Sequence, residues 1–232
     1  MDMHGHTILI TGGATGIGFA LAAWFHDRGN TVILCGRRED RLAEAAAALP
    51  GVYTFRCDVA NESDRQALLR HVTDNFPGLN MLINNAGIQR DIDLTKGTAE
   101  LHDADEVTVD LEAPIRLSAL FTPLLSGKKN ATIVHVSSGL AFMVERAARA
   151  PVYCAAKAGL HAFAVAQRVQ LVSVGIRVVE LIPPMVESEL NREGRIKRGM
   201  LKSPYMMSAG DFAAKALAQM EQGADEIRVA MK

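Results

Sequence analysis

Short runs of apolar and β-branched residues alternate along this chain with longer amphipathic or alanine-rich stretches. Each short run predicts a strand, and each longer stretch predicts the helix that follows it. We expect strands at 7–11, 31–35, 52–56, 79–84, 132–137, 176–182 and 225–230. We expect helices at 17–28, 39–49, 62–76, 103–125, 152–174 and 209–222. This alternation is typical of strand–helix–strand units, so the sequence predicts an α/β fold with a doubly wound parallel sheet of seven strands.

The strand runs are apolar at almost every position, which indicates strands buried on both faces by helices on both sides of the sheet. The pattern loosens after Pro183–Pro184, where residues 185–207 are rich in charge and methionine, with a short helical stretch expected at 187–195. The sequence shows no repeat, low-complexity segment or linker. We therefore expect one domain over 1–232, with a small inserted loop at about 185–207.

Composition narrows the possible partners. The chain carries 25 basic and 26 acidic residues, interleaved along its length, and a net charge of -1. This balance argues against nucleic acid and against a polybasic membrane surface. No apolar run reaches the roughly 18 residues of a membrane span, and the first residues lack the basic region of a signal peptide. We therefore expect a cytoplasmic protein with no membrane partner.

The cysteines and histidines predict no metal site. Cys35, Cys57 and Cys154 are odd in number and lack metal-ligand spacing, so we expect buried free thiols in a reducing compartment. The histidines are scattered, with no carboxylate or cysteine at ligand spacing.

A glycine-rich turn follows the first expected strand and opens the first expected helix, in the order TGGATGIG over residues 11–18. Gly12 suits the tight turn, Gly16 the close approach of a diphosphate, and Gly18 the packing of helix on strand. The helix start then offers free amides and its positive dipole end to phosphates. A turn without any ligand is the alternative, but its place in the first unit favours dinucleotide binding in a Rossmann-type sheet.

The end of the second expected strand bears on which dinucleotide binds. An acidic residue there suits the ribose 2′-hydroxyl of NAD, whereas a basic one suits the 2′-phosphate of NADP. This chain has Arg37 and Arg38 at that point, and the first carboxylate is Glu39. A solvated arginine pair is the alternative, although arginine at a helix start opposes the helix dipole. The sequence therefore favours NADP(H) over NAD(H).

Tyr153 and Lys157 lie four residues apart on an expected helix, so their side chains share one face. A cation beside a phenol favours the phenolate and yields an acid/base that works nearer to neutral pH. The alternative is that Tyr153 and Lys157 are two surface residues with no joint role. The other motifs of the chain decide between these two interpretations.

Five motifs in order carry a family resemblance: residues 11–18, Asp58–Val59, Asn84–Gly87, Ser137–Ser138 and Tyr153–Lys157. Together they make the chain resemble the short-chain dehydrogenase/reductases over nearly its whole length. The resemblance implies that Ser138 holds the substrate carbonyl or hydroxyl, and that Tyr153 is the acid/base. Lys157 would bind the nicotinamide ribose and lower the pKa of Tyr153. Ser137 is the neighbouring candidate for the serine role, but strand alternation turns it to the other face.

The resemblance also implies a set of cofactor contacts. Asp58 would bind the adenine ring with Val59 beside it, the turn at 84–87 would lie next to the cofactor, and the segment at 183–186 would contact the nicotinamide amide. The expected cofactor-binding residues are Gly12, Ala14, Thr15, Gly16, Ile17, Gly18, Arg37, Arg38, Asp58, Val59, Asn85, Ala86, Gly87, Tyr153, Lys157, Pro183 and Val186.

Two stretches depart from the family pattern. Asp110 stands where the family usually has an asparagine that holds a water in a proton relay to the lysine. Its charge would stabilise the Lys157 ammonium and partly offset the help that Lys157 gives to Tyr153, although contact with solvent alone is the alternative. The connection at 139–151 is about two residues longer than the family norm. It offers apolar side chains for one wall of a substrate pocket (Leu140, Phe142, Met143), and the inserted loop offers a methionine lid (Met185, Met200, Met206, Met207). Methionines that only fill gaps in a long loop are the alternative.

The sequence thus predicts an NADP(H)-dependent oxidoreductase that acts on a ketone, aldehyde or secondary alcohol through Ser138, Tyr153 and Lys157, with Asp110 as a fourth catalytic candidate. The alternative is a catalytically weak regulatory protein that keeps the fold and binds NADP(H). Apolar residues surround most of the circumference of the helices expected at 103–125 and 152–174. The family pairs these helices across a two-fold axis, so a homodimer or homotetramer is implied.

Overall fold

The computed structural model describes residues 2–101, 105–197, 199 and 206–230. Its centre is one seven-stranded sheet in the order β3-β2-β1-β4-β5-β6-β7, and every pairing between neighbours is parallel. The strands are β1 Thr7–Thr11, β2 Thr31–Gly36, β3 Tyr53–Arg56, β4 Met81–Asn84, β5 Thr132–Val136, β6 Arg177–Ile182 and β7 Glu226–Arg228. The predicted doubly wound parallel sheet of seven strands is confirmed.

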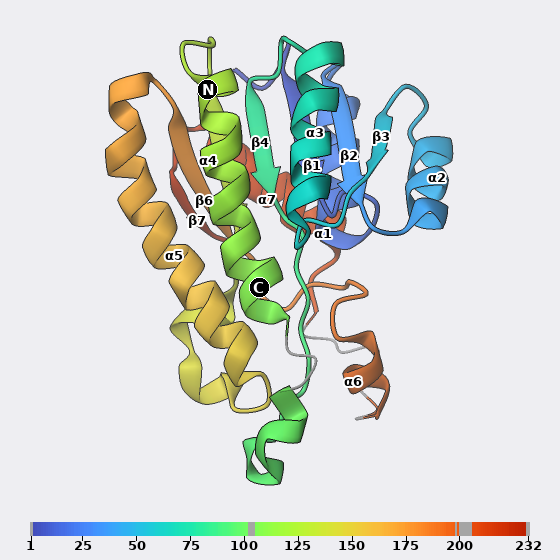
Figure 1. The fold of residues 1–232 in the computed structure, drawn as a ribbon, viewed down its shortest axis with the longest axis vertical. Helices are drawn as coiled ribbons and strands as arrows, with labels where there is room; N and C mark the ends of the chain where they lie inside the picture. Colours follow the sequence, from blue (N-terminus) through green and yellow to red (C-terminus); the bar gives the residue numbers. More distant parts are fainter. Residues whose placement is uncertain (1, 102–104, 198, 200–205, 231–232) are drawn as a thin grey trace.

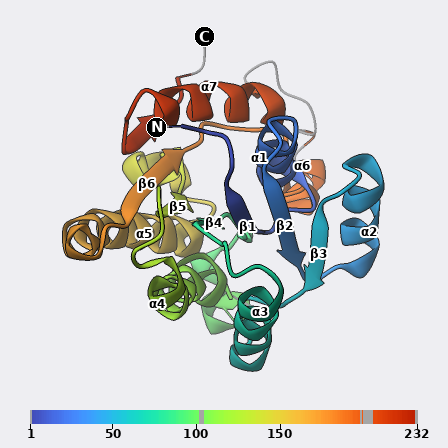
Figure 2. The same cartoon turned by 90° about the horizontal axis from the view of Figure 1, so that it is seen from above.

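Helices cover both faces of this sheet, with α1, α2 and α7 on one face and α3, α4 and α5 on the other (Figures 1 and 2). Alternation along β1 explains the two layers, because Ile8 and Ile10 pack with the first group while Leu9 packs with the second. The helices are α1 Gly16–His26, α2 Glu39–Ala48, α3 Glu62–Asn75, α4 Ala113–Leu125, α5 Pro151–Leu171, α6 Arg192–Lys197 and α7 Ala209–Glu221.

The order of the strands creates a switch point between β1 and β4. The chain runs outward from β1 to β3 and then returns to add β4 on the other side of β1. Connections on the two sides therefore diverge at the carboxyl ends of β1 and β4, which leaves a crevice there. Ligands of open α/β sheets bind at this place, and the glycine-rich turn lies beside it.

The edge strand β3 differs from the expectation that every strand is buried on both faces. Tyr53 and Thr54 are exposed, and β3 pairs only with β2. A strand with a single neighbour lies at the margin of the helix layers, so its apolar residues keep contact with water.

Two helix boundaries also differ. The described part of the helix expected at 103–125 begins at Glu106 and includes a π-helical turn, Thr108–Glu112, before α4. The short helix expected at 187–195 begins only at Arg192, as α6. Before it, Val186 forms a parallel bridge with Met207, and residues 188–191 form bends and a turn in which Asn191 has a φ of 50°. Among the described residues, no helix combines the length and the apolar character that a bilayer crossing requires.

Candidate active site

Tyr153 and Lys157 lie in the first two turns of α5, side by side and buried. Pro151 at the start of α5 suits the first helical turn, where no amide partner is needed. Both side chains are 4% exposed, and the Lys157 Nζ lies 5.7 Å from the centroid of the Tyr153 ring. Lys157 also donates a hydrogen bond to the carbonyl of Val136 at the end of β5, at 3.1 Å. The geometry therefore holds the ammonium against the phenol, as the spacing of the two residues predicts.

Ser138, two residues beyond the end of β5, completes the group. Its side chain acts on Tyr153 and lowers the pKa of the phenol, and its hydroxyl accepts a hydrogen bond from the amide of Leu140 at 3.2 Å. The neighbouring Ser137 hydroxyl is buried and has no hydrogen-bond partner among the described residues. Of the two serines, Ser138 is therefore the one that the structure brings to Tyr153.

The charges around Tyr153 act in opposite directions. Burial is the main influence and raises the pKa of Tyr153, while Lys157 lowers it and Asp110 raises it again. Burial lowers the pKa of Lys157, but attraction to Asp110 and Tyr153 outweighs burial, so this pKa is raised above its ordinary value. The lysine stays an ammonium, and its help to the phenolate is partly cancelled by the carboxylate behind it.

Asp110 contacts Lys157 directly. It is fully buried in the π-helical turn, and its Oδ1 lies 3.0 Å from the Lys157 Nζ. Its Oδ2 accepts a hydrogen bond from the amide of Ile88 at 3.1 Å. Gly87 makes this approach possible, because a Cβ built at Gly87 would lie 2.6 Å from the Asp110 Oδ1. Burial raises the pKa of Asp110, and the attraction of Lys157 opposes that rise.

Sequence reasoning missed a second buried carboxylate, Glu106. It is fully buried, it accepts a hydrogen bond from the amide of Arg90 at 3.0 Å, and its charge raises the pKa of Asp110. Since Glu106 and Asp110 are four residues apart at the start of one helix, their spacing is the signal that points to it.

The glycine-rich turn is tied to the turn after β4. Gly12 and Gly16 have φ angles of 62° and 57°, where a side chain would be strained. A Cβ on Gly18 would lie 2.3 Å from the Gly12 carbonyl oxygen. The Asn85 side chain donates to the carbonyls of Thr11 and Gly12, at 2.9 and 3.1 Å. The glycines thus bring the chain close to itself without side chains at the start of α1, the arrangement that diphosphate binding requires.

Amides of Asn85 and Ala86 also donate to the Thr11 hydroxyl, each at 3.0 Å. The turn that contains Gly87, and with it the contact to Asp110, is thereby fixed to the glycine-rich turn. Ala14, Thr15 and Ile17 are also expected to contact the cofactor. They lie in the glycine-rich turn or at the start of α1.

The basic residues after β2 are engaged by a distant carboxylate. Arg38 and Arg41 form ion pairs with Glu189 at 2.8 and 3.2 Å, whereas Arg37 is exposed. The sequence analysis selected Arg37 and Arg38 but missed Arg41, which lies one helical turn beyond Arg38.

The outer contacts lie at the same edge of the sheet. The Asp58 side chain accepts a hydrogen bond from the amide of Ala60 at 3.0 Å, and Val59 is buried. After β6, the carbonyl of Pro183 accepts from the amide of Gly139 at 3.0 Å, and Val186 bridges to Met207. All of these loops follow carboxyl ends of parallel strands, so the predicted cofactor residues share one side of the molecule.

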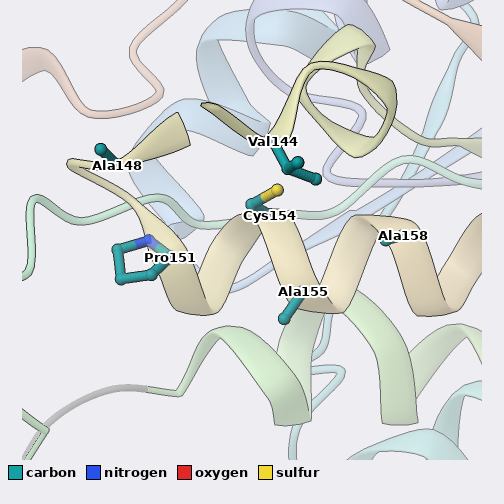
Figure 3. A pocket seen from close by; sticks show the side chains of 6 residues that line it. All are labelled: Val144, Ala148, Pro151, Cys154, Ala155 and Ala158. Carbon is teal, nitrogen blue, oxygen red and sulfur yellow. The ribbon is translucent and has the colours of Figure 1, made fainter. Parts of the chain in front are cut away.

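The apolar side chains expected to line a substrate pocket lie in different surroundings. Phe142 packs edge-on against His161 and beneath Arg228, and Met207 pairs with the strand-like segment at Val186. Met200 lies outside the described residues. A separate apolar cavity of about 300 Å³ lies beside the start of α5, with the Cys154 sulfur pointing toward Val144 (Figure 3). Its lining, Val144, Ala148, Pro151, Cys154, Ala155 and Ala158, includes none of the proposed catalytic residues.

His161 lies close to two carboxylates, although the sequence predicts no metal site at the histidines. The structure brings His161, Glu180 and Glu226 together, with candidate ligand atoms within 4.8 Å of one another. The prediction from spacing missed this because the three residues lie on α5, β6 and β7. Arg228 donates to Glu226 at 2.8 Å and His161 bonds Glu180 at 2.8 Å, so a protein cation already neutralises Glu226.

Known proteins share this fold and sequence pattern. The family model described as short chain dehydrogenase matches residues 6–199. "Uncharacterized oxidoreductase DltE" of Bacillus subtilis (strain 168) is 46% identical over 228 residues, which cover 98% of this chain and 89% of that protein. "Uncharacterized oxidoreductase Mb1385" of Mycobacterium bovis is 32% identical over 193 residues, covering 81% and 76%.

Solved structures agree. A short-chain dehydrogenase from Sphingobium yanoikuyae in complex with NADPH superposes with a TM-score of 0.83 at 25% identity, covering 96% of this chain and 87% of that one. One from Burkholderia phymatum in complex with NAD gives a TM-score of 0.87 at 21% identity, covering 98% and 89%. With the family model and the relatives spanning most of the sequence, this chain belongs to the short-chain dehydrogenase/reductase family of oxidoreductases.

Proposed function

We propose that this chain is an NADP(H)-dependent oxidoreductase that interconverts a ketone or aldehyde and an alcohol, with Tyr153 as the acid/base. One observation carries the proposal: the Tyr153 phenol is buried, with the Lys157 ammonium 5.7 Å from its ring centroid, and both Lys157 and Ser138 lower its pKa. A bound nicotinamide cofactor supplies or accepts the hydride. In reduction Tyr153 gives a proton to the developing alkoxide and Ser138 donates a hydrogen bond to it.

The residues of the glycine-rich turn fit such a cofactor. The positive φ angles at Gly12 and Gly16 and the start of α1 provide a cradle for a diphosphate, which a Cβ at either glycine would strain. Arg37, Arg38 and Arg41 favour the 2′-phosphate of NADP(H), because a guanidinium fork matches a phosphate. The related Sphingobium protein was solved with NADPH, which supports a nicotinamide cofactor for this chain, while the arginines alone carry the preference for NADP(H).

The test is consumption of NADPH by the purified protein against a panel of ketones and aldehydes, with Tyr153→Phe for comparison. We expect the variant to lose at least about 100-fold in turnover, the usual contribution of a positioned acid/base. It should still bind NADPH, as measured by nucleotide fluorescence. Equal rates for both proteins would refute Tyr153 as the acid/base.

A second candidate, a weakly catalytic NADP(H)-binding regulatory protein, rests on Asp110. Its carboxylate raises the pKa of Tyr153 and so opposes the activation that Lys157 provides. Tight NADPH binding without turnover of any carbonyl compound in the same panel would favour this candidate.

We also propose that the chain works as a homo-oligomer in the cytoplasm. Val165, Val169 and Val172 are 41%, 77% and 72% exposed on α5 and the short turn that follows it, and an apolar stripe of this kind suits a helix that pairs with a second copy. The three free cysteines support a reducing compartment. Light scattering after size exclusion distinguishes a monomer from a dimer or tetramer.

A further inference from the structure

A segment of this chain lies across the expected cofactor path. Residues 185–187 leave β6 and pair with Met207, through hydrogen bonds from the Glu187 amide to the Met207 carbonyl at 2.9 Å and from the Met207 amide to the Met185 carbonyl at 3.0 Å. The next residue, Ser188, lies over the glycine-rich turn, because a Cβ built at Gly16 would be 3.2 Å from its Cβ. The segment therefore crosses from β6 to the phosphate-binding turn.

Glu189 continues this crossing to the far side of the turn. Its Oε2 lies 2.8 Å from Arg38 and its Oε1 lies 3.2 Å from Arg41. Each carboxylate oxygen thus faces its own guanidinium group. The ion pair with Arg38 and the nearby charges of Arg41 and Arg192 hold the pKa of Glu189 below its ordinary value, so the group is ionised at neutral pH.

A carboxylate between two arginines occupies the electrostatic position of a phosphate. Both groups accept the two parallel hydrogen bonds of a guanidinium fork, but a phosphate monoester brings three oxygens and about two negative charges where the carboxylate brings two oxygens and one charge. The three side chains are 53%, 36% and 38% exposed for Arg38, Arg41 and Glu189. Exposed ion pairs of this kind are weak, so a more highly charged ligand can displace Glu189.

We infer that Glu189 is a specificity-determining residue, which competes with the 2′-phosphate of NADP(H) for Arg38 and Arg41. NADP(H) must displace Glu189 to gain both arginines, and this displacement frees the segment that crosses the glycine-rich turn. NAD(H) carries no 2′-phosphate, so it leaves the ion pairs of Glu189 with Arg38 and Arg41 in place. This inference rests on the proposed cofactor preference, and it adds that the chain holds its NADP(H) affinity below the value that its arginines allow.

The experiment compares nucleotide affinities of the full-length wild type with Glu189→Gln. The glutamine keeps the size of the side chain and removes its charge. Glu187→Gln is the matched control, since Glu187 is exposed two residues earlier and its substitution removes the same charge from the same segment. Dissociation constants for NADPH and NADH come from nucleotide fluorescence, and those for adenosine 2′,5′-bisphosphate and ADP come from competition.

We expect Glu189→Gln to tighten NADPH and adenosine 2′,5′-bisphosphate about three- to tenfold, the size of one to two exposed ion pairs. NADH and ADP should change less than twofold, and Glu187→Gln should leave every ratio unchanged. Unchanged or weaker NADPH binding in Glu189→Gln would overturn the inference, as would an equal gain for NADH or an equal gain in Glu187→Gln.

The same measurements separate this inference from the proposed function. If the wild type binds neither dinucleotide, the proposed function fails and the inference falls with it. The other case is a wild type that binds NADPH and reduces carbonyl compounds. If the ratio of NADPH to NADH affinity is then the same in the wild type and in Glu189→Gln, only the inference is refuted.

Discussion

Replacing Asp110 by asparagine removes one negative charge from the chain of groups that sets the acidity of Tyr153. Asparagine has nearly the same shape, and its single amide oxygen can accept either from the amide of Ile88, which Asp110 contacts at 3.1 Å, or from Lys157. Lys157 keeps its hydrogen bond to the carbonyl of Val136 at 3.1 Å. The substitution therefore changes charge far more than geometry.

The structure sets the size of the effect. Since the Lys157 Nζ lies 3.0 Å from the Asp110 Oδ1 and 5.7 Å from the Tyr153 ring centroid, the carboxylate lies within about 9 Å of the ring. With an effective dielectric constant of about 20, a unit charge at about 9 Å contributes about 2 kcal/mol. A negative charge disfavours the phenolate, so its removal makes the phenolate easier to form. Alcohol oxidation needs the phenolate as base, and we expect its pH profile to move about one unit toward lower pH.

The assay is the pH dependence of kcat/KM for oxidation of an alcohol identified by the substrate panel, measured from pH 5 to 10. Asp105→Asn is the matched control, because Asp105 is an exposed carboxylate of the same stretch that pairs with Arg90 at 3.5 Å. Its profile should coincide with that of the wild type. An Asp110→Asn profile that also coincides with the wild type, or one that moves to higher pH, would refute the electrostatic reasoning.

Three further changes follow from buried or exposed side chains. Gly87→Ala should lower the free energy of unfolding by about 1–3 kcal/mol in a urea titration, because its Cβ would meet the Asp110 Oδ1 at 2.6 Å; combining it with Asp110→Ala should recover part of that loss. Burial lowers the pKa of His135 to about 4, so the unfolded chain takes up a proton that the folded chain refuses, and stability should fall by about 3 kcal/mol as the pH drops from about 6.5 to about 4. His135→Asn should flatten that fall, and an unaltered pH dependence of unfolding would argue against His135 as its source. Val169→Asp should shift the oligomer toward monomer in light scattering, since this valine is 77% exposed on α5, whereas an unchanged mass would exclude this face as the contact.

The fold was predictable because its signals are local. Each inner strand is apolar at most of its positions, and each helix ends near a glycine or proline that the sequence displays. Boundaries were wrong where non-local pairing and turns took part: Val186 bridges to Met207, and the bends and turn at 188–191 delay the helix to Arg192. The strand β3 was predicted but its exposure was not, since apolar content alone does not reveal which strand lies at the margin of the sheet.

The catalytic group was predictable from a spacing of four residues on one helix, and the ion pairs around it were not. Glu189 lies about 150 positions from Arg38, and nothing near either residue in the sequence indicates their contact. The pairing of His161 with Glu180 is hidden in the same way, because a helix residue meets a residue of the next strand. Charges that pair across the fold leave no periodic trace, whereas hydrophobic burial does.

Asp110 and Glu189 act at opposite ends of the proposed cofactor path, so their effects should be separable. Asp110 contacts Lys157 and influences proton transfer at Tyr153, while Glu189 contacts Arg38 and Arg41 and influences nucleotide affinity. Sites that share no partner usually combine additively. The double variant Asp110→Asn with Glu189→Gln should therefore show the pH shift of the first change and the NADPH affinity of the second, each at full size. A double variant whose pH shift depends on residue 189 would mean that the segment crossing the glycine-rich turn also alters the surroundings of Tyr153.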